Sequence, residues 1–415
     1  MPDNFLPAAE VVGYSLQEHA SRHVMVSTKA NAALQLLFSM GLVHKDECTV
    51  VFPSTSASGH TSTSELVQQM MRIKSCMKEG KTLILVKARH LYESLLDALN
   101  VHYQKDRGGS IEHNLHRTML SMAGVTQSVF VQPSFRCILL EDQQELKSSV
   151  LPPMINRFSK TTITYTSSLN RLQRRSKATI LQKCLVNVPS TGKVANILQF
   201  LVPGFTEESL DSACYYFEDA DEVIERLCYC FSCKNLRRLE LKLIEGLDTD
   251  TASIQIDEWR YFWNSYKCSS DFQSVAKQAL EGRQHLMVIT EQLQLAESSL
   301  VETFQKVFAT VDPNDHQKFT LANVYPKQIT VLNQATSIDV HNSLTTLAGV
   351  KEGQAISLFV LDSTSSTQSV LLDSFMYSVS TVPGLDAKRH HVVLVVNVAD
   401  TLSSSSSQQT ALHHL

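Results

Sequence analysis

The stretch KTLILVKARH (residues 81–90) decides the fold class, because its central residues, Thr82 to Val86, are almost continuously apolar. A strand that is apolar on both faces is typical of a parallel sheet covered by helices, whereas a half-exposed strand alternates apolar and polar residues. Just before it, a helical pattern runs from Glu65 to Lys78 and ends at Gly80. We therefore predict a helix that leads into a buried parallel strand.

The same alternation of strand and helix patterns continues on both sides of this stretch. The predicted strands are His23–Val26, Cys48–Phe52 and Phe135–Leu140, and the predicted helices are Ala30–Met40 and Leu91–Tyr103. Repeated strand–helix units predict an α/β fold in which helices cover a parallel sheet.

A second run of the same kind follows. It has predicted strands at Leu181–Val188, Ile356–Leu361 and Val392–Val398, and predicted helices at Lys193–Leu201, Leu210–Leu247 and Phe272–Phe308. We therefore expect one α/β module over residues 1–165, a linker or abbreviated lid over 166–180, and a second module over 181–401. Residues 402–415 include the run SSSSSQQ, which predicts a disordered tail.

The bulk composition narrows the possible partners. The net charge of −4 and the pI near 6.4 give no argument for binding nucleic acid or a membrane surface. The longest apolar runs fall short of the roughly 18 residues that a transmembrane helix needs. No signal-peptide pattern opens the chain, and the nine scattered cysteines suit a reducing compartment, so we expect a cytosolic protein. The cluster CYCFSC lacks the second ligand pair of a structural zinc site, so we expect no metal there.

Two segments resemble phosphate-binding loops and each other. VSTKANAALQ (26–35) and PSTGKVANILQ (189–199) both place a lysine, Lys29 or Lys193, between a predicted strand and a predicted helix. Such a loop holds phosphate with backbone N–H groups, a helix N-terminus and a lysine. Both segments depart from the full GxxxxGK[ST] signature, because Ala30 and Val194 replace the hydroxyl residue after lysine and Lys29 has no flanking glycine.

Further polar residues stand where an ATPase sheet would need them. Asp362 ends one core strand as a magnesium-binding acid would, and Asn397 or Glu141 stands where a polar sensor ends another. Lys87 directly follows the TLILV strand, and the first acid after it is Glu93. Arg157 follows Glu141 at a spacing that suits an arginine acting on the nucleotide of a neighbouring module.

Three segments, MRIKSCMKEGKTLILV (71–86), ARHLYESLLDALN (88–100) and VQPSFRCILLEDQQELKSSVLPPMINRFSK (131–160), resemble the mysterin family of giant ubiquitin ligases. These proteins contain a dynein-like row of AAA+ modules, and the match is most specific over residues 20–160, which resemble the fourth module. A weaker, colinear resemblance over 180–400 points to the fifth, which the family is thought not to use for hydrolysis.

The resemblance implies roles for individual residues. It makes Ser27, Thr28, Lys29, Ala30 and Glu141 the nucleotide-binding residues of the first module, with Glu93 and Arg157 in catalytic roles. Thr191, Gly192 and Lys193, with Asp362 and Asn397, become remnants of a degenerate second site.

The resemblance also implies cofactors and partners. The cofactor is ATP with Mg²⁺, if any nucleotide is bound, and the partners are neighbouring AAA+ modules of the same polypeptide. No RING ligand set is present, so ubiquitin and a ubiquitin-conjugating enzyme would be engaged only through regions outside these 415 residues. We therefore expect either a piece of a longer protein or a truncated paralogue.

The sequence is consistent with two functions. In the first, the chain is part of the AAA+ core of an ATP-hydrolysing ubiquitin-protein transferase, and the isolated chain is inactive. In the second, it is a non-catalytic segment that transmits conformational change. A Rossmann-type oxidoreductase is excluded, because no GxGxxG motif opens either module.

Overall fold

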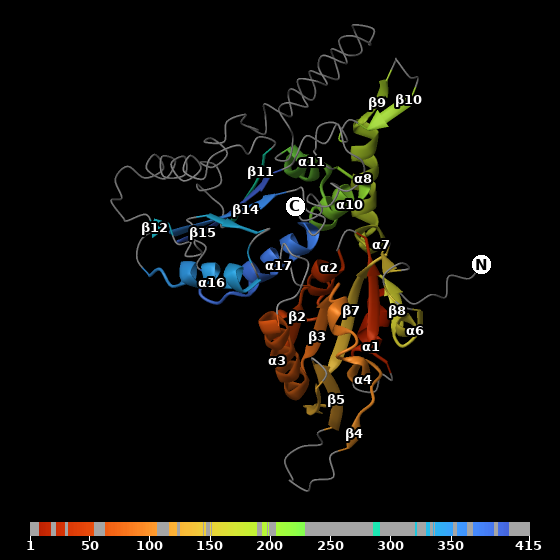
Figure 1. Ribbon diagram of the computed structural model, residues 1–415. Helices are drawn as coiled ribbons and strands as arrows, with labels where there is room; N and C mark the ends of the chain where they lie inside the picture. Colours follow the sequence, from red (N-terminus) through yellow and green to blue (C-terminus); the bar gives the residue numbers. More distant parts are fainter. Residues whose placement is uncertain are drawn as a thin grey trace, which may run out of the picture. The chain divides into compact units, whose positions relative to one another are not determined.

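The computed structural model divides the chain into two units, Met1–Ser168 and Leu169–Leu415, which are described separately (Figure 1). The structure describes residues 8–17, 22–29, 32–53, 63–105, 116–122, 125–143, 145–146, 150, 152–188, 193–196, 198, 205–228, 285–290, 320–321, 329–332, 335, 337–351, 355–362, 368–385 and 389–397. The predicted tail, 402–415, lies outside these residues.

The first unit contains a five-stranded parallel sheet. Its strands are β1 (Val24–Thr28), β2 (Cys48–Val51), β3 (Thr82–Val86), β7 (Arg136–Asp142) and β8 (Ser159–Thr162). They lie in the order β2-β3-β7-β1-β8, and every neighbouring pair is parallel. The α/β prediction is confirmed, and β3 has the bounds that its apolar run indicated. β8 was not predicted, because its sequence, SKTT, is polar and half-exposed.

The described helices of the first unit are short, except for the 17-residue α3. They are α1 (Ala8–Ser15), α2 (Ala33–Ser39), η1 (Lys45–Glu47), α3 (Thr63–Glu79), η2 (Arg89–Leu91), α4 (Leu96–Leu99), α6 (Pro152–Ile155) and α7 (Tyr165–Ser168). The amphipathic α3 buries Met70, Ile73, Cys76 and Met77 in the core beside β3.

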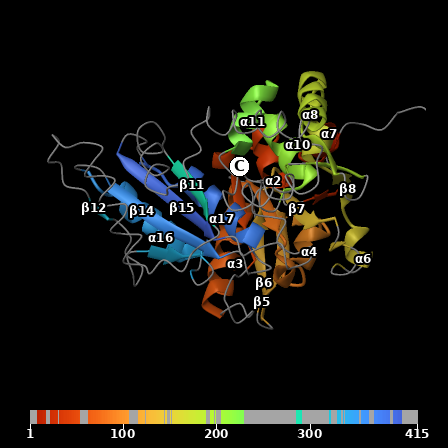
Figure 2. The ribbon, with the colours of Figure 1, turned by 90° about the horizontal axis from the view of Figure 1, so that it is seen from above.

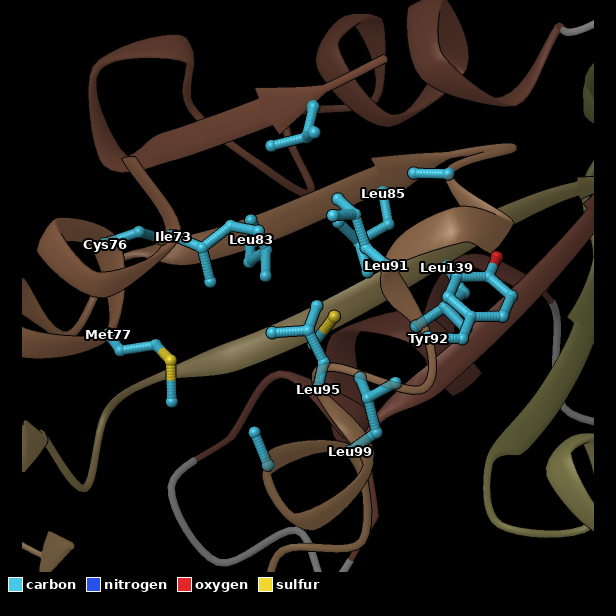
Figure 3. Packing of buried hydrophobic residues seen from close by; sticks show 14 of the residues in the cluster. Ile73, Cys76, Met77, Leu83, Leu85, Leu91, Tyr92, Leu95, Leu99 and Leu139 are labelled. Carbon is cyan, nitrogen blue, oxygen red and sulfur yellow. The ribbon is translucent and has the colours of Figure 1, made fainter. Parts of the chain in front are cut away.

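The helix predicted at Leu91–Tyr103 is wrong, because the segment breaks into η2, turns and α4. Leu91, Tyr92, Leu95 and Leu99 all enter the core beside Leu83, Leu85 and Leu139, as Figure 3 shows. α4 ends at Leu99, and Val101, two residues later, has a left-handed φ of +58° that is incompatible with a continuing helix. Burial of the apolar residues therefore outweighs their helical periodicity.

A three-stranded antiparallel sheet lies between β3 and β7 in the sequence and was also not predicted. It consists of β4 (Gln104–Lys105), β5 (His116–Met122) and β6 (Val125–Val131), with β5 in the middle. β6 packs against α3, where Lys74 Nζ donates to Gln127 Oε1 at 2.6 Å. Most of β6 is exposed, so its sequence lacks the apolar continuity that identified β3.

In the second unit, three helices pack together. α8 (Arg171–Lys183) begins with a capping box between Asn170 and Gln173, and it contacts α10 (Glu207–Tyr216) and α11 (Ala220–Cys228). Lys177 Nζ lies 2.6 Å from the buried carboxylate of Asp211 on α10. The predicted linker therefore contains the first three turns of an ordered helix.

After α8, β9 (Leu185–Val188) and β10 (Lys193–Asn196) form an antiparallel pair. The strand predicted from Leu181 therefore begins four residues late, and the helix predicted from Lys193 is wrong over Lys193–Asn196. A short apolar run cannot be assigned to helix or strand by periodicity alone, and here cross-strand pairing of Lys193 with Val188 decides.

The second parallel sheet has β15 (His390–Asn397) between β11 (His285–Thr290) and β14 (Ala355–Asp362). The short strands β12 (Thr320–Leu321) and β13 (Ile329–Val331) both pair with β14, and all pairs are parallel. Two helices, α16 (Ser337–Ala348) and α17 (Gln368–Thr381), pack on each other and on β14 (Figure 2).

The strands β14 and β15 agree with the predicted strands to within two residues at each end. β11, however, lies inside the helix predicted at Phe272–Phe308, so that helix is wrong over His285–Thr290. HLMVIT is a short apolar run whose strand state depends on its parallel pairing with β15. Among the described residues, no helix is long and apolar enough to cross a membrane.

Replacement of Gly80 by alanine should destabilise the first unit. Gly80 has a φ of +71°, and an added Cβ would lie 2.1 Å from Ser134 Oγ and 2.9 Å from Gln132 Cβ. We expect a loss of about 1–3 kcal/mol in the free energy of unfolding, measured with urea. The control is Gly13→Ala on α1, where the added methyl meets nothing within 4 Å and should not destabilise the chain. Equal stability of the two variants would contradict the prediction.

His23 should make the first unit less stable in mild acid. Burial lowers the pKa of His23 from 6.5 to about 4, although its hydrogen bond to Ala98 opposes this shift. The ring is neutral in the fold, because Nδ1 accepts from Cys137 N–H while Nε2 lies 3.1 Å from the Ala98 carbonyl. The unfolded histidine takes up a proton first, so stability is complete above about pH 6.5 and is lost as pH falls toward 4.

Between pH 7 and pH 5 we expect a loss on the order of 2 kcal/mol in the free energy of unfolding, measured with urea at both pH values. The variant His23→Gln should lose less over the same interval. An equal pH dependence in both proteins would exclude His23 as the cause.

Candidate functional site

The carboxyl edge of the first sheet is the candidate ligand-binding edge. The neighbours of β1 are β7 and β8, yet the chain leaves β1 for β2 at one end of the sheet and reaches β8 last, on the other side. In open parallel sheets, ligands bind at the carboxyl ends of the strands where the strand order reverses in this way. The registers Thr28↔Asp142 and Val86↔Leu140 bring the ends of β1, β3 and β7 to this edge.

Lys29 lies at this edge, directly after β1, and the residue is exposed. The two residues before it are turned into the protein. The Ser27 hydroxyl lies 2.6 Å from that of Thr162, and Thr28 Oγ1 accepts a hydrogen bond from Ala33 N–H at 3.1 Å. Thr28 therefore occupies an amide at the start of α2 that a phosphate loop would offer to its ligand. Ala30, also predicted to bind nucleotide, lies outside the described residues.

The end of β3 is cationic, where a magnesium-binding ATPase sheet would need an acid. Lys87 follows β3 with a φ of +48°, and its N–H donates to the Leu140 carbonyl at 2.9 Å. This left-handed turn starts η2 at Arg89. The Arg89 guanidinium reaches the end of β7, where Nε and Nη2 donate to Glu141 Oε2 at 3.1 and 2.7 Å.

Glu141 has no exposed surface, and both of its carboxylate oxygens are engaged. Oε2 accepts from Arg89, and Oε1 accepts from the Tyr92 hydroxyl at 2.5 Å. Arg89 Nη2 also lies 2.8 Å from Glu145 Oε2, and Lys87 Nζ lies 3.6 Å from Glu145 Oε1. We call these five residues, Lys87, Arg89, Tyr92, Glu141 and Glu145, the edge cluster.

The pKa shifts follow from these contacts. Burial raises the pKa of Tyr92 well above its usual range, and the charge and hydrogen bond of Glu141 act in the same direction. Burial opposes the charge of Arg89, but the hydrogen bonds to Glu141 and Glu145 outweigh it and raise the pKa of Arg89. Burial likewise opposes ionisation of Glu145, but its hydrogen bond with Arg89 leads to a lowered pKa. The cluster therefore consists of charged side chains around a neutral tyrosine donor.

The edge cluster does not fit a magnesium–nucleotide complex. Mg²⁺ takes oxygen ligands in near-octahedral geometry, and both oxygens of Glu141 already accept from Arg89 and Tyr92. No group of three or more His, Cys, Asp or Glu residues that could hold a metal is found in the part of the chain that the structure describes.

The two residues with predicted catalytic roles, Glu93 and Arg157, are not members of the edge cluster. Glu93 is exposed in the turn between η2 and α4, seven residues after the end of β3. Arg157 is half-buried in the turn before β8. Ser159 pairs with Val24, so Arg157 lies before the amino end of β8, and Val24 is itself about 17 Å along the strand from Lys29. The structure therefore does not bring Arg157 and Lys29 together.

In the second unit, two of the five predicted remnants pair with each other, and a third lies in a different sheet. Asp362 and Asn397 are paired neighbours at the carboxyl ends of β14 and β15. Lys193 instead begins β10 in an antiparallel pair, so a strand–loop–helix arrangement is not formed over 193–196. Thr191 and Gly192 lie outside the described residues. The strand beside Asn397 is β11, and the sequence after it has neither glycine nor lysine before Lys306.

Sequence reasoning missed Arg89 and Tyr92. A signal was present, since Lys87 and Arg89 directly follow an apolar strand that should end in an acid. The partner of Arg89 could not be found in this way, because Glu141 is 52 residues away.

Comparison with known proteins finds relatives for the first unit. Residues 13–169 match the family model described as RNF213 AAA domain. The chain is 29% identical over 173 residues to the human E3 ubiquitin-protein ligase RNF213 and 27% identical over 157 residues to the mouse protein. It is 30% identical over 158 residues to the zebrafish E3 ubiquitin-protein ligase rnf213-beta. These matches cover 41%, 38% and 37% of the chain, and each spans only 3% of the relative.

Replacement of Tyr92 by phenylalanine should destabilise the first unit. The change removes the hydrogen bond to Glu141 Oε1 and leaves one carboxylate oxygen without a donor in a buried site. We expect the free energy of unfolding, measured with urea, to fall by about 1–3 kcal/mol. Tyr14→Phe is the control, because Tyr14 is 67% exposed. If both variants unfold at the same urea concentration as the unmodified chain, the hydrogen bond contributes nothing.

Proposed function

We infer, from the premise that the first unit is an AAA+ domain of the RNF213 (mysterin) family, that this chain is a non-hydrolysing segment of a mysterin-type ubiquitin-protein ligase. Its AAA+ units would transmit conformational change between neighbouring modules of the same polypeptide. The name of the relatives, E3 ubiquitin-protein ligase, supports the parent activity. Ubiquitin transfer itself is assigned to sequence outside these residues, because the chain spans 3% of the relatives that it matches.

The edge cluster is the observation that carries this proposal. Phosphoryl transfer in P-loop ATPases depends on Mg²⁺ held by a strand-end acid and on a residue that orients the attacking water. Lys87 and Arg89 stand at the end of β3 instead, and Glu141 at the end of β7 is enclosed by Arg89 and Tyr92. Both oxygens of Glu141 already accept hydrogen bonds inside the fold, which leaves little capacity for a metal ion or a water.

The remaining site residues fit a module that contacts its neighbours. Lys29 presents one positive charge at the open edge, which suits a phosphate contact without catalysis. Arg157 belongs to the opposite edge, which suits contact with the adjacent module in a row. The cytosol is the compartment that we propose, from the cysteine content of the sequence.

The second candidate function is ATP hydrolysis with Mg²⁺ in the parent protein. It is favoured by the positions of Lys29 and Arg157, which match those of a phosphate-loop lysine and an arginine acting in trans. In this alternative Glu93 would have to take the role of the catalytic acid. Its exposed position in a turn, seven residues after β3, gives that role little support.

Phosphate release from ATP separates the two candidates. We expect the purified chain with Mg²⁺ to release no phosphate above the buffer rate, and Lys29→Ala to behave in the same way. In the polypeptide that contains the flanking modules, Lys29→Ala should leave the rate of ATP turnover unchanged. The control is Lys78→Ala, an exposed lysine in the last turn of α3. A rate that falls more than about tenfold on Lys29→Ala but not on Lys78→Ala would establish hydrolysis at this site, since tenfold corresponds to about 1.4 kcal/mol of transition-state stabilisation.

A further inference from the structure

Arg89 occupies an unusual position, because one guanidinium joins two carboxylates at the carboxyl edge of the first sheet. Its Nη2 lies 2.7 Å from Glu141 Oε2 and 2.8 Å from Glu145 Oε2. Its Nε donates to the same oxygen of Glu141. The two carboxylates come from the end of β7 and the turn after it, and Arg89 comes from the turn after β3. Arg89 therefore ties the two strand ends together.

A divalent cation is the alternative group that could bridge two such carboxylates. It would need open oxygen lone pairs on Glu141 and Glu145 and would add two positive charges. The edge cluster already contains two cations, Lys87 and Arg89, and two carboxylates, so its formal charge is zero. A metal ion would have to displace Arg89, whose guanidinium cannot lose its proton to make room.

We propose that the guanidinium of Arg89 occupies the position that a divalent cation would need between Glu141 and Glu145. The site therefore does not bind a divalent cation while Arg89 is present. This inference rests on the proposed function in taking the carboxyl edge as the ligand edge, and it names the residue that keeps a divalent cation out of that edge.

The burial of Glu141 explains why Arg89 must remain paired with it. Glu141 has no exposed surface, so its charge needs a partner within the fold at all times. Tyr92 donates to its second oxygen, so neither oxygen points to solvent. Lys87 adds a contact to Glu145 from the left-handed turn that also binds the Leu140 carbonyl. The strand ends of β3 and β7 are thereby held together whether or not a ligand is present.

The test compares thermal unfolding in EDTA with unfolding in millimolar Mg²⁺ or Mn²⁺, for the whole chain without nucleotide. The unmodified chain should have the same Tm in all three solutions. Arg89→Met keeps the length of the side chain but removes its charge, and in EDTA its Tm should fall by roughly 5–10 °C. Mn²⁺ should restore at least half of that fall, because two carboxylates without a cation are then available to the metal.

Two further variants complete the design. Arg72→Met removes an exposed arginine that makes one hydrogen bond, to the Val50 carbonyl, and should leave the Tm within about 2 °C in every solution. The double variant Arg89→Met with Glu141→Gln removes both charges of the buried pair. It should be more stable in EDTA than Arg89→Met alone, and it should not respond to Mn²⁺.

A rise of several degrees in the Tm of the unmodified chain with Mg²⁺ or Mn²⁺ alone would overturn the proposal. An Arg89→Met variant that is destabilised but has no response to Mn²⁺ would overturn it as well. If Arg89→Met does not fold, electron paramagnetic resonance of Mn²⁺ with the unmodified chain and with the double variant decides, since neither should bind the ion. Phosphate release is a separate measurement, so failure of the proposed function remains distinguishable from failure of the role given to Arg89.

Discussion

Glu141 is a carboxylate without exposed surface, and the carboxyl edge of the first sheet is arranged around its charge. A buried charge of this kind is tolerated only when it is paired and hydrogen-bonded. Arg89 supplies the opposite charge and Tyr92 the second donor. Both come from the segment after β3, so the neutralisation of one glutamate constrains the path of the chain as it leaves β3.

The path of the chain after β3 follows from this constraint. Lys87 takes a left-handed conformation and Arg89 begins a short 3-10 helix, which together direct Arg89 and Tyr92 to the end of β7. On its other side, the same segment buries Leu91, Leu95 and Leu99 in the core beside α3 and β3. One short segment therefore serves the hydrophobic core and the polar edge, which explains why it is not a regular helix.

The burial of Glu141 also bears on how the carboxyl edge of the first sheet could be used. Lys29 follows β1 at the carboxyl edge of the first sheet, which is the edge where open parallel sheets bind their ligands. At this edge Glu141 is paired with Arg89 and accepts from Tyr92. The ends of β3 and β7 are therefore stabilised by contacts within the first unit.

The α/β class, the bounds of β3 and the buried strands β7, β14 and β15 follow from the sequence, because continuous apolar runs depend only on local composition. The sequence also placed Asp362 and Asn397 at strand ends, and it placed Lys29 three residues after a strand that in the structure extends to Thr28. The other features depend on tertiary contacts. The partner of Arg89 lies 52 residues away, the assignment of Lys193 to β10 depends on antiparallel pairing, and the assignment of β11 depends on a strand about a hundred residues later. Ion pairs and strand pairing join residues that are distant in the chain, so no local pattern carries them.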